Sequence, residues 1–229
     1  MIKWFRHSSK ETRAQFPFRF LPTLSDGHSD SGVATGHYFH QDLWAARHIY
    51  NNEPSRHIDI GSRIDGFIAH LICFRDVEVV DIRALNSNVS GLAFHQADMM
   101  SSTELGIDPA PSVSCLHALE HFGLSRYGDA LTPDGWKTGF ANLSKLVAPG
   151  GLLYIGVPIG RPAVEFNAQR IFHPAYVLEE ASKHGLTLQS WACVDDNGDF
   201  KSLEMPPQPD QISALAKFNY ACGLFIFKK

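Results

Sequence analysis

Two histidines and a glutamate stand close together in the stretch SCLHALEHFG, residues 114–123. His117, Glu120 and His121 spell H-x-x-E-H, which is the pattern of the inverted zinc peptidases. On a helix, His117 and His121 would share one face, where neutral imidazoles can bind a metal ion. The other chemistry open to these residues is proton transfer, with His121 or His117 as general base and Glu120 as its partner. Which chemistry applies, metal binding or proton transfer, depends on the secondary structure that holds the three residues.

The surroundings of this motif argue against a zinc peptidase. The run SVSCLHA predicts a strand that ends near His117, and Gly123 follows His121 by two residues. A regular helix carrying both histidines therefore has no room to form. We expect a loop with a short helix that lines an active site, and we assign no metal ligands. A weak metal site that uses the two histidines stays an alternative.

Short apolar runs alternate with amphipathic segments along most of the chain. Alternation of this kind predicts an α/β fold: a doubly wound, Rossmann-like, mostly parallel sheet with helices on both faces. Two strands that follow the last helix should form an antiparallel C-terminal pair and complete a seven-stranded sheet. The expected strands are IDI (Ile58–Ile60), VEVVD, LAFHQAD, SVSCLHA, LLYIGVP, LTLQSWACVDD and YACGLFIFKK, with a proline-rich loop, KSLEMPPQPDQ, between the last two. Helices are expected to start near Ile64 and to cover GWKTGFANLSKLV and HPAYVLEEASKHG. A further helix, FHQDLWAARHIYNN, would carry Phe39, Leu43, Trp44, Ile49 and Tyr50 near one face.

The N-terminal 36 residues differ from the rest. Basic and aromatic residues alternate over residues 3–20, and TLSDGHSDSGVATG then has the composition of a flexible loop. We therefore divide the chain into an N-terminal arm or lid, residues 1–36, and a domain, residues 37–229. The arm could bind a membrane surface or a partner. The interpretation we favour is a helix whose aromatic side chains pack on the domain.

Polar residues and glycines gather where the expected strands end. In a doubly wound sheet the ligand binds at the carboxyl ends of the strands. Glycines after the first strand let the backbone approach a ligand closely. Asp81 lies 22 residues beyond Asp59, a spacing suited to an acid that accepts the hydroxyls of a ribose. The remaining candidates are Gly61, Ser62 and Gly66 after the first strand, Asp98 and Met99 after the third, and His117 after the fourth.

Taken together, DIGSRIDG, Asp81, QADM, SCLHALEHFG and LVAPGGLLYIGVP resemble the ordered motifs of class I S-adenosylmethionine-dependent methyltransferases over residues 40–229. The stretch from Tyr38 to Leu71 is more closely similar to a bacterial subgroup of uncharacterised methyltransferase-like proteins, classed as a domain of unknown function. The chain departs from the family's first motif at Ser62 and Arg63, where many members carry a glycine.

The resemblance implies that S-adenosylmethionine is the cofactor. It places Asp59, Gly61, Ser62 and Gly66 around the glycine turn and the methionine moiety. It also implies that Asp81 with Ile82 holds the ribose, that Asp98 and Met99 hold the adenine, and that His117 lies under the sulfonium or the substrate.

Composition and charge exclude several function classes. The formal net charge is −4, so nothing global attracts nucleic acid, and we expect none as a partner. The start of the chain lacks the apolar core of a signal peptide, and no stretch approaches the length of a membrane span. The four cysteines form no C-x-x-C pair. We expect a cytoplasmic protein with reduced cysteines.

The function most consistent with these motifs is O-methylation of a small molecule or of a sugar hydroxyl in a glycan. The chain lacks the N/D-P-P-Y/F motif linked with amino-group acceptors and has CLHALEHF in that region. The alternative is a catalytically inactive binding module on the methyltransferase fold, and a nicotinamide-dependent enzyme is a third, less favoured possibility. Arg170 could hold an acidic substrate, although a local structural role is favoured.

Overall fold

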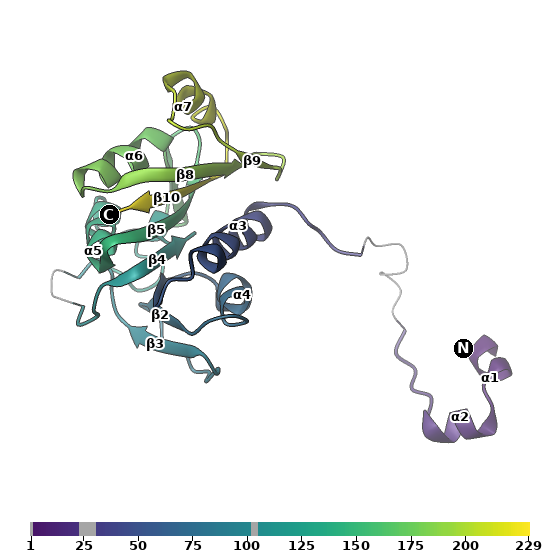
Figure 1. The fold of residues 1–229 in the computed structure, drawn as a ribbon. Helices are drawn as coiled ribbons and strands as arrows, with labels where there is room; N and C mark the ends of the chain where they lie inside the picture. The colour runs from purple at the N-terminus through teal and green to yellow at the C-terminus, as the bar shows by residue number, and fades with distance from the viewer. Residues whose placement is uncertain (1, 23–30, 102–104) are drawn as a thin grey trace. The chain divides into compact units, whose positions relative to one another are not determined.

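The computed structural model describes residues 2–22, 31–101 and 105–229 (Figure 1). The chain divides into two compact units, Met1–Val33 and Ala34–Lys229, and each is described by itself. Within these described ranges, none of the helices is both long enough and apolar enough to cross a membrane.

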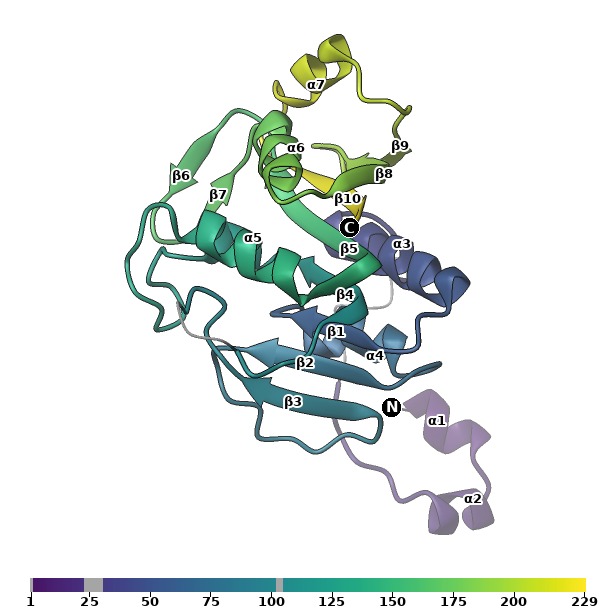
Figure 2. The same ribbon diagram turned by 60° about the vertical axis from the view of Figure 1, so that its left-hand side comes forward.

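An eight-stranded sheet forms the centre of the larger unit (Figure 2). Its strand order is β3-β2-β1-β4-β5-β10-β8-β9. Strands β1 to β5 run parallel, whereas β10 lies antiparallel between β5 and β8. The strands are β1 His57–Ile60, β2 Val77–Asp81, β3 Leu92–Gln96, β4 Ala110–Leu116, β5 Val147–Ile159, β8 Thr187–Val194, β9 Phe200–Ser202 and β10 Ala221–Lys228, and a separate hairpin pairs β6 Ala163–Glu165 with β7 Gln169–Ile171.

The mostly parallel sheet with an antiparallel C-terminal pair is confirmed, but the expected count of seven strands is wrong. The eighth strand, β9, pairs antiparallel with the end of β8. Asp195 makes this possible, because its Oδ1 accepts the backbone N–H groups of Asn197 and Asp199 and turns the chain back. The proline-rich segment that we expected to be a loop also contains a short helix, α7 (Pro209–Leu215).

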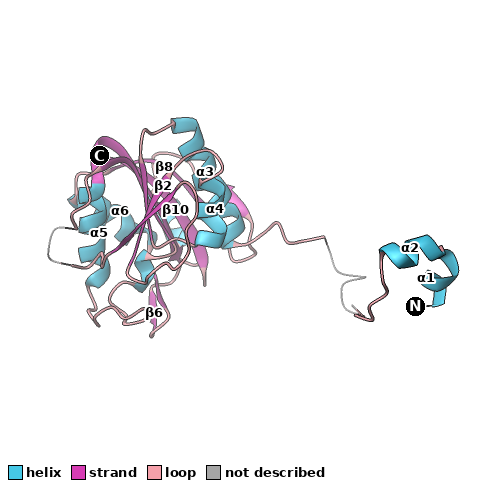
Figure 3. Ribbon diagram, turned by 90° about the horizontal axis from the view of Figure 1, so that it is seen from below, coloured by secondary structure: helices cyan, strands magenta, loops and turns pink. Residues whose placement is uncertain are grey.

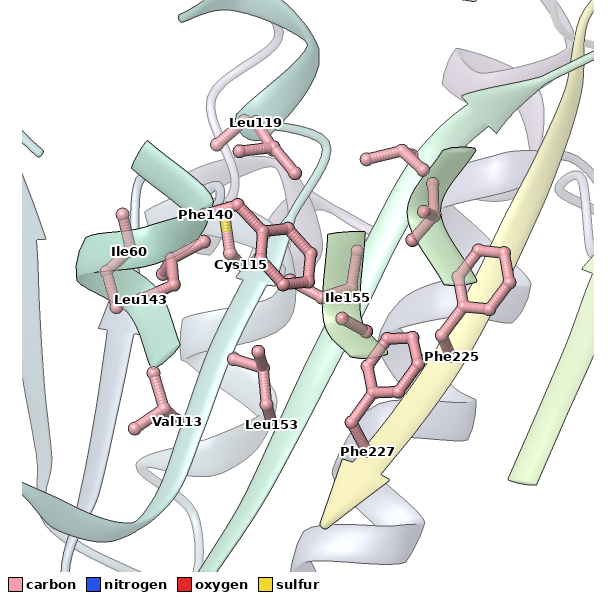
Figure 4. Packing of buried hydrophobic residues seen from close by; sticks show 14 of the residues in the cluster. Ile60, Val113, Cys115, Leu119, Phe140, Leu143, Leu153, Ile155, Phe225 and Phe227 are labelled. Carbon is pink, nitrogen blue, oxygen red and sulfur yellow. The ribbon is translucent and has the colours of Figure 1, made fainter. Parts of the chain in front are cut away.

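Helices cover both faces of the sheet (Figure 3). On one face lie α3 (His37–Asn52) and a π-helical turn, η1 (Ile64–Ile68), which continues into α4 (Ala69–Leu71). On the other face lie α5 (Gly135–Leu146) and α6 (Pro174–Lys183). Each layer has its own core. The aromatic side chains of Phe140, Phe225 and Phe227 fill the space under α5 (Figure 4).

Helix α3 does not bury the residues that the sequence pattern indicates. Phe39 and Tyr50 are 41% and 59% exposed. The face that packs on the sheet carries Ala45, Ala46 and Ile49, and it continues at its N-terminal end with the polar pair Gln41 and Asp42. Buried polar groups need hydrogen-bond partners, and the Gln41 amide donates to the Asp42 carboxylate at 3.2 Å.

The described part of the arm holds two short helices, α1 (Ile2–His7) and α2 (Lys10–Gln15). Its aromatic side chains contact one another: the rings of Trp4, Phe5 and Phe18 lie 5.1–5.7 Å apart. The Arg13 guanidinium closes the arm on itself by donating to the carbonyl of Phe5. The expected loop falls partly on residues 23–30, which lie outside the described residues.

Candidate cofactor and active site

A cavity opens where the strand order reverses beside β1. It lies at the carboxyl ends of β1 to β4 and encloses about 540 Å³, including space open to solvent. Ligands bind at this place in doubly wound sheets. Its lining comprises Ile60, Gly61, Val80, Asp81, Ile82, Arg83, Ala97, Asp98, Met99, Met100, His117, Ala118, His121, Phe122, Tyr127 and Asp129.

The turn after β1 requires glycine at position 61. Gly61 has a φ of 68°, a left-handed conformation that side chains disfavour. A Cβ at this position would stand 2.9 Å from the Cβ of Ala118. The Gly61 N–H donates to the Val80 carbonyl at 2.9 Å, which ties the turn to β2. The backbone therefore forms a close, side-chain-free floor for the cavity.

Asp59 and Ser62 belong to a buried polar network behind this floor. The Asp59 carboxylate accepts hydrogen bonds from the Ser62 N–H, the Ser62 hydroxyl and the Ser114 hydroxyl, at 3.0, 2.7 and 2.5 Å. Ser62 in turn accepts from the Leu116 N–H. Burial raises the pKa of Asp59 to about 6, although these donors oppose the shift. The network fixes the ends of β1 and β4 together.

Neither Asp59 nor Ser62 is among the residues that line the cavity, and Gly66 is not either. A Cβ on Gly66 would meet the Asp42 carboxylate at 2.8 Å, so this glycine makes room for α3. Their contact with a cofactor stays a prediction. In the structure their contacts shape the turn and its packing.

Asp81 ends β2 at the cavity wall, as the sequence predicts. Its carboxylate accepts from the backbone N–H of Arg83 at 2.8 Å and from the Arg83 guanidinium at 3.0 and 2.7 Å. That guanidinium lies 4.4 Å from the ring centre of Tyr127, a cation–π contact. Ile82 adds an apolar wall beside it. The carboxylate is thus at the expected place but already holds a partner.

Asp98 and Met99 follow β3, the strand next to β2, and also line the cavity. The Asp98 carboxylate accepts the N–H of Met100 at 2.8 Å, which rigidifies the turn. Asn142, on α5, donates to the Met99 carbonyl at 2.9 Å, and the Met99 side chain is 4% exposed. A carboxylate and a buried thioether are thus fixed beside the cavity, which suits a planar ring that carries an amino group.

His117 leaves β4 in a left-handed conformation, with a φ of 51°. Its N–H donates to the Gly156 carbonyl, and its Nδ1 lies 2.8 Å from Glu120 Oε1. Burial alone would lower the pKa of His117, but the neighbouring Cys222 sulfur and the Glu120 carboxylate raise it well above its ordinary value. Glu120 is 1% exposed, and its Oε2 has no hydrogen-bond partner within the described part of the chain. The chain continues into η2 (Leu119–His121), a single 3₁₀ turn. The expected short helix is confirmed, and the long helix of a zinc peptidase does not form.

His121 lines the cavity and has one unprotonated ring nitrogen. Its Nδ1 lies 2.6 Å from the Ala168 carbonyl, which accepts only, so Nδ1 carries the hydrogen and Nε2 the lone pair. Burial lowers the pKa of His121, which keeps the ring neutral at pH 7. Nε2 lies 3.7 Å from Glu120 Oε1.

Arg170 has the local structural role favoured from sequence. It is 6% exposed, and its guanidinium donates to three carbonyls, those of Glu120, Phe122 and Pro133. These bonds fasten the loop after η2 to the segment before α5. Asp129 orders the same loop by accepting three backbone N–H groups.

The sequence analysis missed a set of side chains packed around His117. The His37 ring stacks on it at 5.4 Å between ring centres, and the Tyr38 ring lies at 5.1 Å. The Tyr220 ring also stacks on His37, at 5.0 Å between ring centres, and Cys222 lies close by on β10. The clue in the sequence was the i, i+4 spacing of His37 and Gln41, two polar residues on the inner face of an amphipathic helix.

Comparisons with known proteins support the fold. A family model described as "Caenorhabditis protein of unknown function, DUF268" matches residues 93–178. No curated protein matches the chain. Among solved structures, the N-methyltransferase NodS of Bradyrhizobium japonicum, in complex with S-adenosylhomocysteine, is 14% identical with a TM-score of 0.57, over 85% of this chain and 88% of that one.

Two further solved structures with similar folds have different chemistry. A 1,6-didemethyltoxoflavin-N1-methyltransferase of Burkholderia thailandensis, with bound substrate and S-adenosylhomocysteine, is 16% identical with a TM-score of 0.55, over 91% of this chain and 98% of that one. The [4+2]-cyclase SpnF is 12% identical with a TM-score of 0.52, over 76% and 75%. The chain therefore has the Rossmann-like fold of the S-adenosylmethionine-dependent methyltransferases, and the cyclase shows that this fold also carries other chemistry.

Proposed function

We propose that this protein binds S-adenosylmethionine and transfers its methyl group to a hydroxyl of a small molecule or a glycan. The observation that carries the proposal is the cavity at the ends of β1 to β4. It joins a glycine floor, Gly61, to two carboxylates at neighbouring strand ends, Asp81 and Asp98. The cofactor carries a cationic sulfonium, a ribose diol and an adenine amine. A carboxylate attracts the cation and accepts hydrogen bonds from the hydroxyls and the amine.

The residues present fit this cofactor. Asp81 would accept the two ribose hydroxyls once Arg83 moves aside, with Ile82 against the sugar. Met99 and Ile82 would enclose the adenine ring, and Asp98 would accept its amino group. His117 lines the inner end of the cavity, where the sulfonium would lie. When bound, the cofactor supplies an activated methyl group, so the protein has mainly to hold the acceptor in line.

A hydroxyl acceptor must lose its proton as it is methylated, and His121 is the residue we propose as general base. His121 lines the cavity, and its Nδ1–H donates to the Ala168 carbonyl, which fixes the tautomer and leaves Nε2 unprotonated. An imidazole in this state accepts a proton near neutral pH. Glu120 and His117 form the buried pair beside it. We propose that they position His121 and the acceptor.

The cofactor and the transfer can be tested in one assay. The purified protein is incubated with S-adenosylmethionine and a panel of sugars, nucleotide sugars and phenols, and release of S-adenosylhomocysteine is measured. Acceptor-dependent release supports the proposal. Binding of the cofactor without release for any acceptor supports the alternative, a catalytically inactive binding module.

Three further sequence predictions stay proposals. We propose a role for residues 1–36 as an arm or lid, action in the cytoplasm, and no nucleic-acid partner, since the net charge is −4. The closer similarity to a bacterial subgroup is likewise proposed from the stretch between Tyr38 and Leu71.

A further inference from the structure

Three potential metal ligands from distant parts of the chain meet beside the cavity. His37 begins α3, His117 follows β4, and Cys222 lies on β10. One ligand atom from each lies within 4.8 Å of the other two. We propose that these three residues form a binding site for a divalent transition-metal ion of the Zn²⁺ type, a site that the sequence did not predict.

The donor set suits such an ion. Two imidazoles and a thiolate are ligands that zinc prefers, and three protein ligands leave a fourth position for water or a substrate oxygen. In a tetrahedral zinc site with bonds of about 2.0–2.3 Å, neighbouring ligand atoms stand roughly 3.3–3.6 Å apart. The three atoms would have to close by about 1 Å. His37 is only partly buried and starts its helix, so its side chain can make this adjustment.

A second observation points to a ligand at this place. The His117 side chain is 3% exposed, yet its Nε2 has no hydrogen-bond partner among the described residues. Buried polar atoms are rarely left unpaired, and a metal ion would satisfy this nitrogen. The nearby Cys222 sulfur donates only weakly, at 3.7 Å to Gln41 Oε1.

Glu120 supports His117 in the manner expected of a metal ligand. Its carboxylate lies 2.8 Å from His117 Nδ1, which keeps a hydrogen on that nitrogen, and a metal ion would bind Nε2 in exchange for the proton that Nε2 otherwise carries. Metal-bound histidines usually donate their second ring N–H to such a carboxylate, which fixes the tautomer and strengthens the ligand. The Gln41 amide oxygen beside Cys222 is a further neutral group at the edge of the site.

The site can be tested on the full chain without a polyhistidine tag and without S-adenosylmethionine, so its outcome does not depend on the proposed function. Co²⁺ is the probe, because thiolate ligation gives it a charge-transfer absorption band and a tetrahedral site gives intense d–d bands. We expect a single ion per chain with both features. Zn²⁺ should displace it and raise the melting temperature by mass action.

Variants identify the ligands. Cys222→Ser should remove the charge-transfer band, and His37→Gln, at a partly exposed position, should weaken Co²⁺ binding at least tenfold while the thiolate band remains at saturation. Cys73→Ser is the matched control, because Cys73 is the exposed cysteine, and it should change nothing. Circular dichroism shows whether each variant is folded.

Two results would overturn the proposal. One is a wild-type protein that binds no Co²⁺ or Zn²⁺ at micromolar concentration. The other is a thiolate band that survives in folded Cys222→Ser, or an unchanged affinity in His37→Gln. If His121→Asn abolished binding while His37→Gln did not, the ion would belong to the H-x-x-E-H pair instead.

Discussion

The Arg83 guanidinium holds the carboxylate of Asp81, with Nε 3.0 Å from Oδ1 and Nη2 2.7 Å from Oδ2. A ribose diol would donate its hydrogen bonds to the same two carboxylate oxygens. The Arg83 side chain is 53% exposed and also stacks on Tyr127, so it can swing away without leaving a buried charge unpaired. If the cofactor binds as proposed, Arg83 competes with it for Asp81.

Replacing Arg83 should tighten cofactor binding. An exposed ion pair contributes up to about 1 kcal/mol, so Arg83→Ala should lower the dissociation constant of S-adenosylmethionine by about two- to fivefold. The control is Arg63→Ala, which removes an exposed ion pair with Asp65 outside the cavity. A marked loss of affinity in Arg83→Ala would mean that the arginine contacts the cofactor itself.

A methyl group at position 61 should be poorly tolerated. Gly61→Ala combines a left-handed φ with a Cβ 2.9 Å from Ala118. Gly185→Ala is a matched control, because Gly185 has a similar φ of 71° but open space around it. Urea denaturation should show that Gly61→Ala lowers the free energy of unfolding by about 1–3 kcal/mol more than Gly185→Ala does. Equal losses in the two variants would contradict the close approach.

Acid should destabilise the protein through buried neutral histidines. Burial lowers the pKa of His57 from 6.5 to about 3 and that of His37 from 6.5 to about 4. The unfolded chain then binds more protons than the folded one below pH 6.5, so the stability that these groups contribute is present above pH 6.5 and lost as the pH falls toward 4 and 3. Asp59, whose pKa is raised to about 6, acts in the opposite direction between pH 6 and 4.

Urea titrations in the presence of a chelator, at several values between pH 7 and 4, test this balance. The free energy of unfolding should decrease as the pH is lowered. His57→Gln should reduce the slope of this dependence by up to about 1.4 kcal/mol per pH unit. His7→Gln, at an exposed position of the arm, should leave the slope unchanged. A slope that His57→Gln does not alter would show that His57 titrates normally.

The proposed general base predicts a pH profile for methyl transfer. Because burial lowers the pKa of His121, the rate limited by chemistry should rise with pH through a midpoint below 6.5 and stay level above it. His121→Gln should lower the rate by about 10²–10⁴-fold and remove this dependence. Asn142→Ala, which removes the hydrogen bond to the Met99 carbonyl, should lower the rate without shifting the midpoint. An unchanged rate in His121→Gln would assign the proton to another group.

Local patterns in the sequence were sufficient to predict most of the sheet. Apolar runs bounded by glycine, proline or aspartate coincide with β1 to β5, β8 and β10, since burial on both faces demands such runs. Strand β9 was not predicted, because Phe200–Ser202 has no apolar run and its pairing depends on the turn at Asp195. Helix α3 was predicted with the wrong buried face. Gln41 and Asp42 are buried because they hydrogen-bond to each other and Gln41 accepts from Cys222, contacts that hydrophobic periodicity does not indicate.

The site was predicted where it depends on strand ends and missed where it depends on long-range packing. Asp81 ends β2, and Asp98 and Met99 follow β3 within three residues, so a parallel sheet brings them to one cavity. His37 and Cys222 stand 185 positions apart in the numbering, and only the antiparallel insertion of β10 beside β5 places them near His117.

We expect the cavity at the ends of β1 to β4 to bind S-adenosylmethionine through Asp81. Calorimetric titration with S-adenosylmethionine and S-adenosylhomocysteine measures this binding. We predict micromolar binding of both ligands, weakened at least about thirtyfold in Asp81→Ala, where hydrogen bonds to a charged group are lost, and unchanged in Asp65→Ala, at an exposed position outside the cavity. Absence of binding at millimolar ligand, or full affinity in Asp81→Ala, would contradict the account.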